Sequence, residues 1–254
     1  MSELFSIQLQ NRQQQGRDGV WLDLPTTTEQ VQAALRQIGI SSDNPQGLFI
    51  SGYFAEEEKR FAIPYNMVLA SNVDELNFLA SRLETLSTGE RAELNAALQA
   101  PQSELLSIGR ITDFPENVEY YVHLPDVRGP AQLGDYYLNR SGMVDMPDEW
   151  KGGIDTAQFG RYVAQQEQGV FTEYGYLVKS GDAWQKVHED QSVPEEYRVL
   201  SFPAPEVLRD AANIPPPVQP ETEPQKVIPI ILNGKDSAER MKEITDRLET
   251  GIQQ

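Results

Sequence analysis

Three capping motifs constrain the fold of this chain most strongly, because each marks the start of a helix. In a capping box, a Ser or Thr at the helix N-cap is followed three residues later by a side chain that bonds back to it. Such pairs occur at Thr26 and Glu29, at Ser71 and Asp74, and at Ser87 and Glu90. Each pair precedes apolar residues spaced three to four apart, so the sequence predicts three amphipathic helices.

Short alternating segments surround the first of these helices. Residues 4–10, 19–25 and 47–54 place apolar side chains at every second position, which predicts three half-buried strands. The helix after Pro25 carries one apolar stripe and is closed by Gly39. Residues 1–62 are therefore expected to form an N-terminal α+β domain, a small sheet with one covering helix.

The next two segments change in character. The second and third capping motifs predict two helices joined by a short turn at residues 87–89, an antiparallel hairpin. Residues 63–102 are thus expected to form a small helical domain. Residues 103–178 predict a mixed α+β domain, with strands at 118–124 and 170–178 and helices at 132–142 and 155–167.

The remaining chain has a different composition. Residues 179–226 are expected to form a semi-ordered extension that ends in a proline-rich linker. Residues 227–254 predict a short apolar strand and a helix whose stripe consists of Met241, Ile244 and Leu248. This stripe suits docking to a partner or self-association, and it equally suits a helix that folds back on its own domain.

Charge and cysteine content exclude several classes of protein. The net charge of −18 repels phosphate backbones and anionic membrane surfaces, so we expect no direct nucleic-acid or membrane partner. Simple solubility is the ordinary explanation for such acidity. The absence of cysteine excludes disulfides, Cys-based zinc sites and thiol nucleophiles. No signal-peptide pattern and no membrane-spanning apolar run are found, which predicts a cytoplasmic protein.

Catalytic motifs are also scarce. His123 and His188 lie far apart, and neither has a partner at a metal-ligand spacing. Motifs for nucleophilic serine chemistry or for nucleotide phosphates do not occur. A carboxylate pair of the glycosidase type remains an alternative, but most acids lie at outward helix positions or in turns. We therefore predict a protein that is not an enzyme and needs no cofactor or metal.

The acidic residues are unevenly distributed. Residues 111–149 contain eight acidic and two basic side chains, and this stretch also contains the tyrosine pairs 120–121 and 136–137. Carboxylates spaced like phosphates on a rigid protein can occupy the groove of a DNA-binding enzyme. The acids expected on such a surface are Glu56, Glu57, Glu58, Asp74, Glu75, Glu84, Glu90, Glu93, Asp113, Glu116, Glu119, Asp126, Asp135, Asp145, Asp148 and Glu149.

Four segments together resemble the ArdA family of antirestriction proteins over residues 3–178. They are GVWLDLPTTTEQVQAALRQIGI, DELNFLASRLETLSTGERAELNAAL, LGDYYLNRSGMVDMPDEWKGGIDTAQFGRYV and VFTEYGYLV. The third is the most specific, because an acidic helix, an acidic loop and the Phe159-Gly160-Arg161 helix follow in order. The predicted boundaries near residues 62 and 102 agree with the three small domains of that family.

The resemblance implies a curved rod and a homodimer joined through the third domain. It implies that the acidic surface mimics bent B-form DNA and blocks the DNA groove of type I restriction–modification enzymes, in their methyltransferase core. Such proteins are typically carried by conjugative plasmids and transposons. The extension after residue 178 departs from the family pattern. An acidic adaptor that docks partners through its C-terminal helix is the alternative function.

Overall fold

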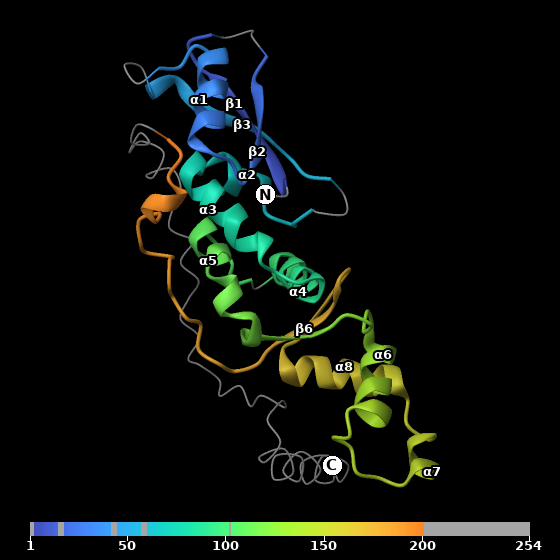
Figure 1. Ribbon diagram of the computed structural model, residues 1–254. Coiled ribbons are helices and arrows are strands. Elements are labelled where there is room, and N and C mark those ends of the chain that lie inside the picture. The colour runs from blue at the N-terminus through green and yellow to red at the C-terminus, as the bar shows by residue number, and fades with distance from the viewer. Residues whose placement is uncertain (1–2, 15–17, 42–44, 57–59, 102, 201–254) are drawn as a thin grey trace, which may run out of the picture. The chain divides into compact units, whose positions relative to one another are not determined.

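The computed structural model describes residues 3–14, 18–41, 45–56, 60–101 and 103–200 (Figure 1). The described chain is mixed α+β, with two small antiparallel sheets and several helices. It divides into two compact units. Within the described residues, unit 1 consists of residues 3–98, 103–117 and 185–200, and unit 2 consists of residues 99–101 and 118–184. The three-domain division stays a prediction.

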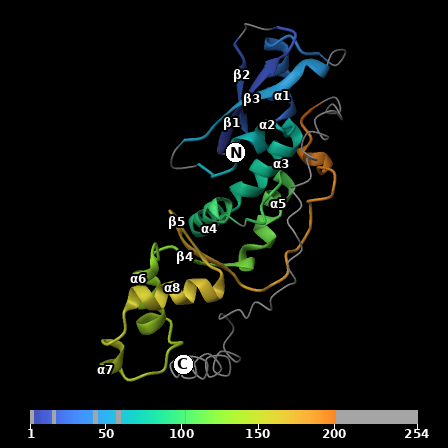
Figure 2. The same ribbon diagram turned by 180° about the vertical axis from the view of Figure 1, so that it is seen from behind.

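Unit 1 begins with a three-stranded antiparallel sheet in the order β2-β1-β3. Its strands are β1 (Phe5–Asn11), β2 (Val20–Leu24) and β3 (Leu48–Phe54), and η1 (Pro45–Gly47) precedes the last. Ile7 pairs with Leu22 on one side and Tyr53 on the other. The alternating residues of β1 are buried as predicted, so one face of the sheet forms the core with α1 (Thr28–Gln37) (Figures 1 and 2).

The first helix starts one residue later than the sequence predicts. Thr27, not Thr26, is the N-cap, and its hydroxyl accepts a hydrogen bond from the main-chain N–H of Gln30. Thr26 is instead buried, where its N–H donates to the side chain of Asn77 at 2.7 Å. Tertiary contact thus displaced the cap. The helix ends as predicted, because Gly39 adopts φ 68°, a conformation that favours glycine.

Helices form the rest of the unit 1 core. They are α2 (Tyr65–Leu69), α3 (Val73–Glu84), α4 (Thr88–Gln99) and α5 (Ile108–Thr112), followed by η3 (Phe114–Glu116). The N-cap of α3 is Asn72, with Glu75 completing the capping box, so the predicted pair of Ser71 and Asp74 is wrong by one residue. The predicted pair of Ser87 and Glu90 is confirmed by two reciprocal hydrogen bonds.

The chain returns to unit 1 after residue 184. We call residues 185–200 the strap. It contains only one short helical turn among the described elements, η6 (Glu195–Tyr197). Val199 is the one side chain in the strap that is buried.

Unit 2 contains a second antiparallel sheet in the order β4-β6-β5, formed by β4 (Tyr121–Leu124), β5 (Val170–Thr172) and β6 (Gly175–Lys179). The single strand predicted over residues 170–178 is wrong, because this segment is a hairpin. Gly175 adopts φ 134° at its turn, which reverses the chain where an uninterrupted strand was expected. The predicted strand at 118–124 is shortened at its start by η4 (Val118–Tyr120).

The helices of unit 2 are α6 (Pro130–Asp135), the π-helical η5 (Tyr136–Arg140), α7 (Asp148–Lys151) and α8 (Thr156–Glu167). α6 and α8 pack at backbone distance through glycine: a Cβ on Gly160 would lie 1.8 Å from the carbonyl oxygen of Pro130. The N-cap of α8 is Asp155, whose side chain accepts two hydrogen bonds from main-chain N–H groups of the first turn.

Among the helices that the structure describes, none combines the length and the apolar character needed to cross a lipid bilayer.

Candidate acidic surface

Exposed carboxylates of unit 2 lie in its turns and on two of its short helices. Glu119 is on η4, Asp126 follows β4, and Asp145 precedes α7. Asp148 and Glu149 form the first turn of α7. All five are exposed, as the sequence predicts. Turns and the first turns of helices suit acidic side chains. In a turn the carboxylate remains hydrated, and at a helix start it interacts favourably with the helix dipole, so it needs no buried partner.

Ion pairs partly neutralise two of the predicted acids of unit 2. Asp135 bonds to Arg140 at 2.6 Å, and Asp148 bonds to Lys151 at 2.9 Å. Hydrogen bonds from Asn139 and Arg140 lower the pKa of Asp135. Within the described residues, no salt bridge involves the other four predicted acids that are exposed in unit 2, which are Glu119, Asp126, Asp145 and Glu149. Residues 118–184 carry ten acidic and five basic side chains, so a surplus of negative charge remains there.

Most of the predicted acids of unit 1 are half-buried or form hydrogen bonds or ion pairs. Glu56 is exposed, and Glu84 is half-buried. Glu75 and Glu90 accept hydrogen bonds from the N-cap residues of their own helices, and the bonds from Ser87 lower the pKa of Glu90. Glu116 is exposed and forms an ion pair with Arg82.

Three predicted surface acids are partly or fully withdrawn from solvent, and for Asp113 the expectation of an exposed side chain is wrong. Asp113 is 0% exposed and accepts hydrogen bonds from three main-chain N–H groups of the strap. Asp74 is half-buried and accepts two more. Glu93 is half-buried, and burial together with the charge of Glu90 raises its pKa to about 8. A carboxyl group with that pKa is mostly neutral at pH 7.

Several predicted positions lie outside the described residues. They are Glu57, Glu58, Met241, Ile244 and Leu248.

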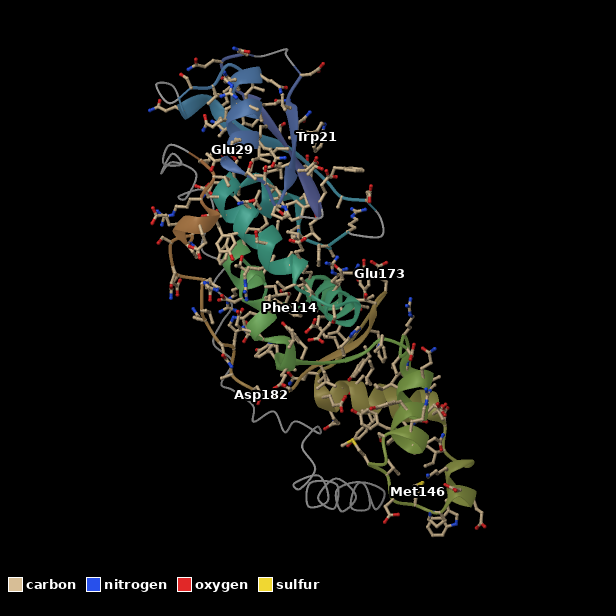
Figure 3. The ribbon with its side chains drawn as sticks, in the orientation of Figure 1. Trp21, Glu29, Phe114, Met146, Glu173 and Asp182 are labelled. Carbon is tan, nitrogen blue, oxygen red and sulfur yellow. The ribbon has the colours of Figure 1, made fainter. Side chains whose placement is uncertain are left out.

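Sequence reasoning missed ten exposed acids among the described residues. Four lie near the start of unit 1, three in unit 2 and three on the strap: Glu3, Asp18, Asp23, Glu29, Asp155, Glu173, Asp182, Asp190, Glu195 and Glu196. Figure 3 labels Glu173 and Asp182. Glu173 lies in the β5–β6 turn, and Asp155 caps α8. Both kinds of position expose a side chain, so turn and cap positions carried the missing signal.

Two possible chemical sites lie in unit 1. Asp113, Glu116 and His188 offer ligand atoms within 4.8 Å of one another. The oxygens of Asp113 already accept three N–H donors, and Glu116 pairs with Arg82, so we assign no metal to this cluster. A cavity of about 80 Å³ is lined by Glu75 and Glu189. It is far smaller than ordinary ligand pockets, and it does not suit glycoside hydrolysis.

Unit 2 contains a buried carboxylate that sequence reasoning also missed. Glu167 accepts hydrogen bonds from the hydroxyls of Tyr137 and Tyr176, the latter at 2.8 Å. Burial raises the pKa of Glu167. Tyr137 and Tyr121 are the buried members of the two tyrosine pairs, and Tyr136 and Tyr120 are half-buried. These aromatics are therefore mainly core residues.

His123 is a half-buried residue of β4. Its Nε2 lies 2.9 Å from the carbonyl oxygen of Tyr174, and burial lowers its pKa. Among the residues that the structure describes, His123 belongs to no group of three potential metal ligands.

No curated protein is significantly similar to the chain. A family model described as antirestriction protein (ArdA) matches residues 15–178, more than half of the 254 residues. The matched range includes Glu119, Asp126, Asp145 and Glu149 and ends before the strap.

Proposed function

Because the chain belongs to the ArdA family of antirestriction proteins, we propose that it blocks type I restriction–modification enzymes by occupying their DNA-binding groove. Membership of the family implies an antirestriction function. The mechanism is the proposal: an acidic surface competes with DNA for the methyltransferase core. The observation that carries it is the group of exposed, unpaired acids in unit 2, Glu119, Asp126, Asp145 and Glu149.

The physical argument concerns charge rather than catalysis. A groove that binds DNA presents Lys and Arg to phosphates and gains free energy when counterions are released. A folded protein with unpaired surface carboxylates gains from the same terms. The proposed inhibitor therefore acts stoichiometrically and has no catalytic step. It acts in the cytoplasm, where it protects mobile DNA that enters a new host.

The family resemblance also suggests a three-domain curved rod and a homodimer joined through residues 103–178. Exposed aromatic side chains in unit 2 support the dimer. Trp150 on α7 is 67% exposed, and Tyr162 on α8 is 39% exposed. Aromatic side chains are enriched at the centres of protein interfaces, where burying them removes much apolar surface from water.

Competition for DNA tests the mechanism. A type I methyltransferase core is bound to labelled duplex DNA, the protein is added, and DNA release is followed over a salt series. We expect release at near-stoichiometric protein and weaker inhibition as salt increases, because salt screens the charges. No release at any salt concentration that permits DNA binding would contradict the proposal.

A matched pair of variants tests whether the exposed acids of unit 2 bind the restriction enzyme. The test variant neutralises the four predicted acids of unit 2 that are exposed and form no described salt bridge: Glu119→Gln, Asp126→Asn, Asp145→Asn and Glu149→Gln. The control neutralises four exposed acids that lie elsewhere: Glu3→Gln, Asp18→Asn, Glu195→Gln and Glu196→Gln. At about 0.5 kcal/mol for each exposed charge, the test variant loses about 2 kcal/mol of affinity, about thirtyfold. Equal loss in both variants would show that only net charge matters.

A further inference from the structure

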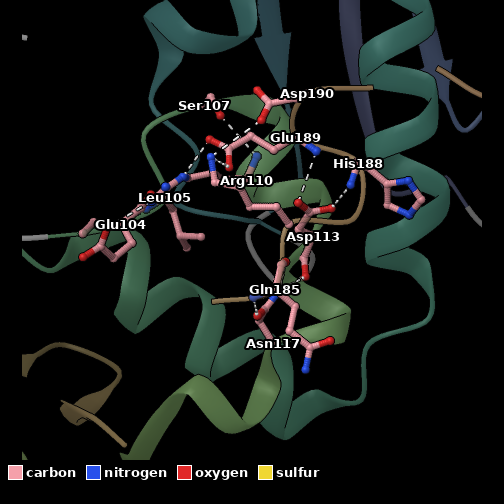
Figure 4. A network of polar contacts seen from close by, with 12 residues as sticks. Glu104, Leu105, Ser107, Arg110, Asp113, Asn117, Gln185, His188, Glu189 and Asp190 are labelled. Carbon is pink, nitrogen blue, oxygen red and sulfur yellow. Dashed lines mark hydrogen bonds and ion pairs between the residues drawn. The ribbon is translucent and has the colours of Figure 1, made fainter. Parts of the chain in front are cut away.

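The strap lies beyond the family-matched residues, yet specific hydrogen bonds hold it to unit 1 (Figure 4). It packs against α3, α5 and the turn after α5. Because only Val199 of its 16 residues is buried, apolar burial contributes little to its docking. The polar contacts must therefore supply most of the specificity.

Asp113 recognises three consecutive main-chain amides. Its Oδ1 accepts from His188 N at 2.6 Å, and its Oδ2 accepts from Val187 N at 3.1 Å and from Glu189 N at 3.2 Å. Hydrogen bonds to a charged acceptor are stronger than those between neutral groups. With the strap docked, the carboxylate is fully buried, and these three N–H donors satisfy its oxygens.

Asn117 recognises the main chain at the start of the strap. Its Nδ2 donates to the carbonyl of Gln185 at 3.0 Å, and its Oδ1 accepts from the N–H of the same residue at 2.7 Å. The side-chain amide of Asn117 thus forms hydrogen bonds with both the N–H and the carbonyl group of Gln185. Asn117 is the last residue of unit 1 before unit 2, and Gln185 is the first after it.

Two residues of α3 hold the other end of the strap in the same way. Asn77 donates to the carbonyl of Tyr197 at 3.0 Å. Asp74 Oδ1 accepts from Val199 N at 2.7 Å and from Leu200 N at 2.8 Å. Four side chains of unit 1 therefore bind strap main chain and not strap side chains.

Three further contacts shape the groove. Arg110 Nε donates to Glu189 at 2.8 Å, which fixes one strap side chain. A Cβ on Gly109 would lie 2.9 Å from the Cα of Glu189, so glycine permits the strap backbone to approach α5. The ring of Phe78 lies 5.0 Å from that of His188 and 4.7 Å from that of Tyr197.

We propose that α3, α5 and Asn117 form a binding site for an extended peptide main chain, and that residues 185–200 occupy this site as a ligand in cis. Docking withdraws Asp74 and Asp113 from the acidic surface. It also fixes Leu200, the residue from which the remaining 54 residues continue. The proposal is independent of the antirestriction mechanism, because none of its contacts involves a restriction enzyme.

Hydrogen exchange on the full chain tests the docking. We expect slow exchange at Val187, His188 and Glu189. Asp113→Asn removes the charged acceptor and should speed exchange there about tenfold or more. The matched control is Asp126→Asn, an exposed acid of unit 2, which should leave strap exchange unchanged. Strap amides that exchange at the unprotected rate in the wild-type chain would overturn the proposal.

Binding of a separate peptide tests whether the strap is a ligand of this site or an ordinary part of the core of unit 1. A full-length variant with Glu189→Gln and Tyr197→Ala weakens the cis strap without changing the groove. A fluorescent peptide of residues 185–200 should bind this variant at least tenfold more tightly than wild type, because the tethered strap competes at high effective concentration. A scrambled peptide is the control. Failure of the native peptide to bind the variant would overturn the proposal.

If Asp113→Asn unfolds unit 1, exchange in β1 will also become fast. The peptide experiment then decides, because its variant changes only the strap.

Discussion

Glu93→Gln is expected to stabilise unit 1 at pH 8 and to have little effect at pH 5. Glu93 lies on α4, half-buried, and its Oε1 is buried without a hydrogen-bond partner among the described residues. Glu90 lies one turn earlier on the same helix. Burial and this neighbouring charge raise the pKa of Glu93 to about 8, whereas a Glu in the unfolded chain has a pKa of about 4.3.

The sign follows from proton binding. Between these two pKa values the unfolded chain has an ionised Glu93 and the folded chain has a protonated one, so folding takes up a proton. The contribution of Glu93 to stability is therefore complete below about pH 4.3 and is lost as the pH rises towards 8. Glutamine has no charge to bury, so residue 93 contributes no pH dependence to the free energy of unfolding of the Glu93→Gln variant.

The magnitude follows from the same values. At 1.36 kcal/mol for each pKa unit, the full difference would correspond to about 5 kcal/mol. Solvent reaches part of this half-buried side chain, and we therefore expect about 2 kcal/mol. In the wild-type chain, this amount of stability is lost between pH 5 and pH 8.

Urea denaturation followed by far-ultraviolet circular dichroism at both pH values measures the difference. Hydrogen exchange of α4 peptides assigns the transition to unit 1. Glu149→Gln is the control, since this residue is exposed in unit 2. A Glu93→Gln variant whose free energy of unfolding differs from wild type by the same amount at pH 5 and pH 8 would refute the reasoning.

Two further substitutions test unit 2. Gly160→Ala should destabilise unit 2 by about 3 kcal/mol or more, because its Cβ would lie 1.8 Å from the carbonyl oxygen of Pro130. Gly129→Ala meets no atom within 4 Å and is the control for urea denaturation, and equal stability of the two would contradict this packing. Trp150→Ser should weaken the proposed dimer about thirtyfold, as loss of an interface aromatic costs about 2 kcal/mol. Sedimentation equilibrium measures this against Leu106→Ser, exposed in unit 1, and unchanged dimerisation in both would remove Trp150 from the interface.

Local patterns predicted most helices and strands correctly because their causes lie within a few residues. The alternation at Phe5, Ile7 and Leu9 and the reciprocal bonds of Ser87 and Glu90 both appear in the structure. The errors arose where a distant group competed. Asn77 binds the N–H of Thr26, a residue 51 positions away, and the cap moves to Thr27.

The acidic surface was predictable in the same limited sense. Acids in turns and at helix starts, such as Asp126, Asp145 and Glu149, are exposed as expected. Asp113 lies at the end of α5, where an acid is ordinarily exposed too. No neighbouring residue distinguishes it from Asp126, Asp145 or Glu149. Its three donors lie 74 to 76 residues further along the chain, so its burial could not be read from its neighbours.

The sequence by itself determined the excess of acid, the absence of thiol chemistry, most of the element order and the family. These depend on composition, on short-range periodicity and on the order of segments. Only the tertiary structure decided which carboxylates remain charged at the surface and where the strap docks. A carboxylate's environment depends on every group packed around it, and the strap's donors and acceptors meet α3 and α5 only after the chain has folded.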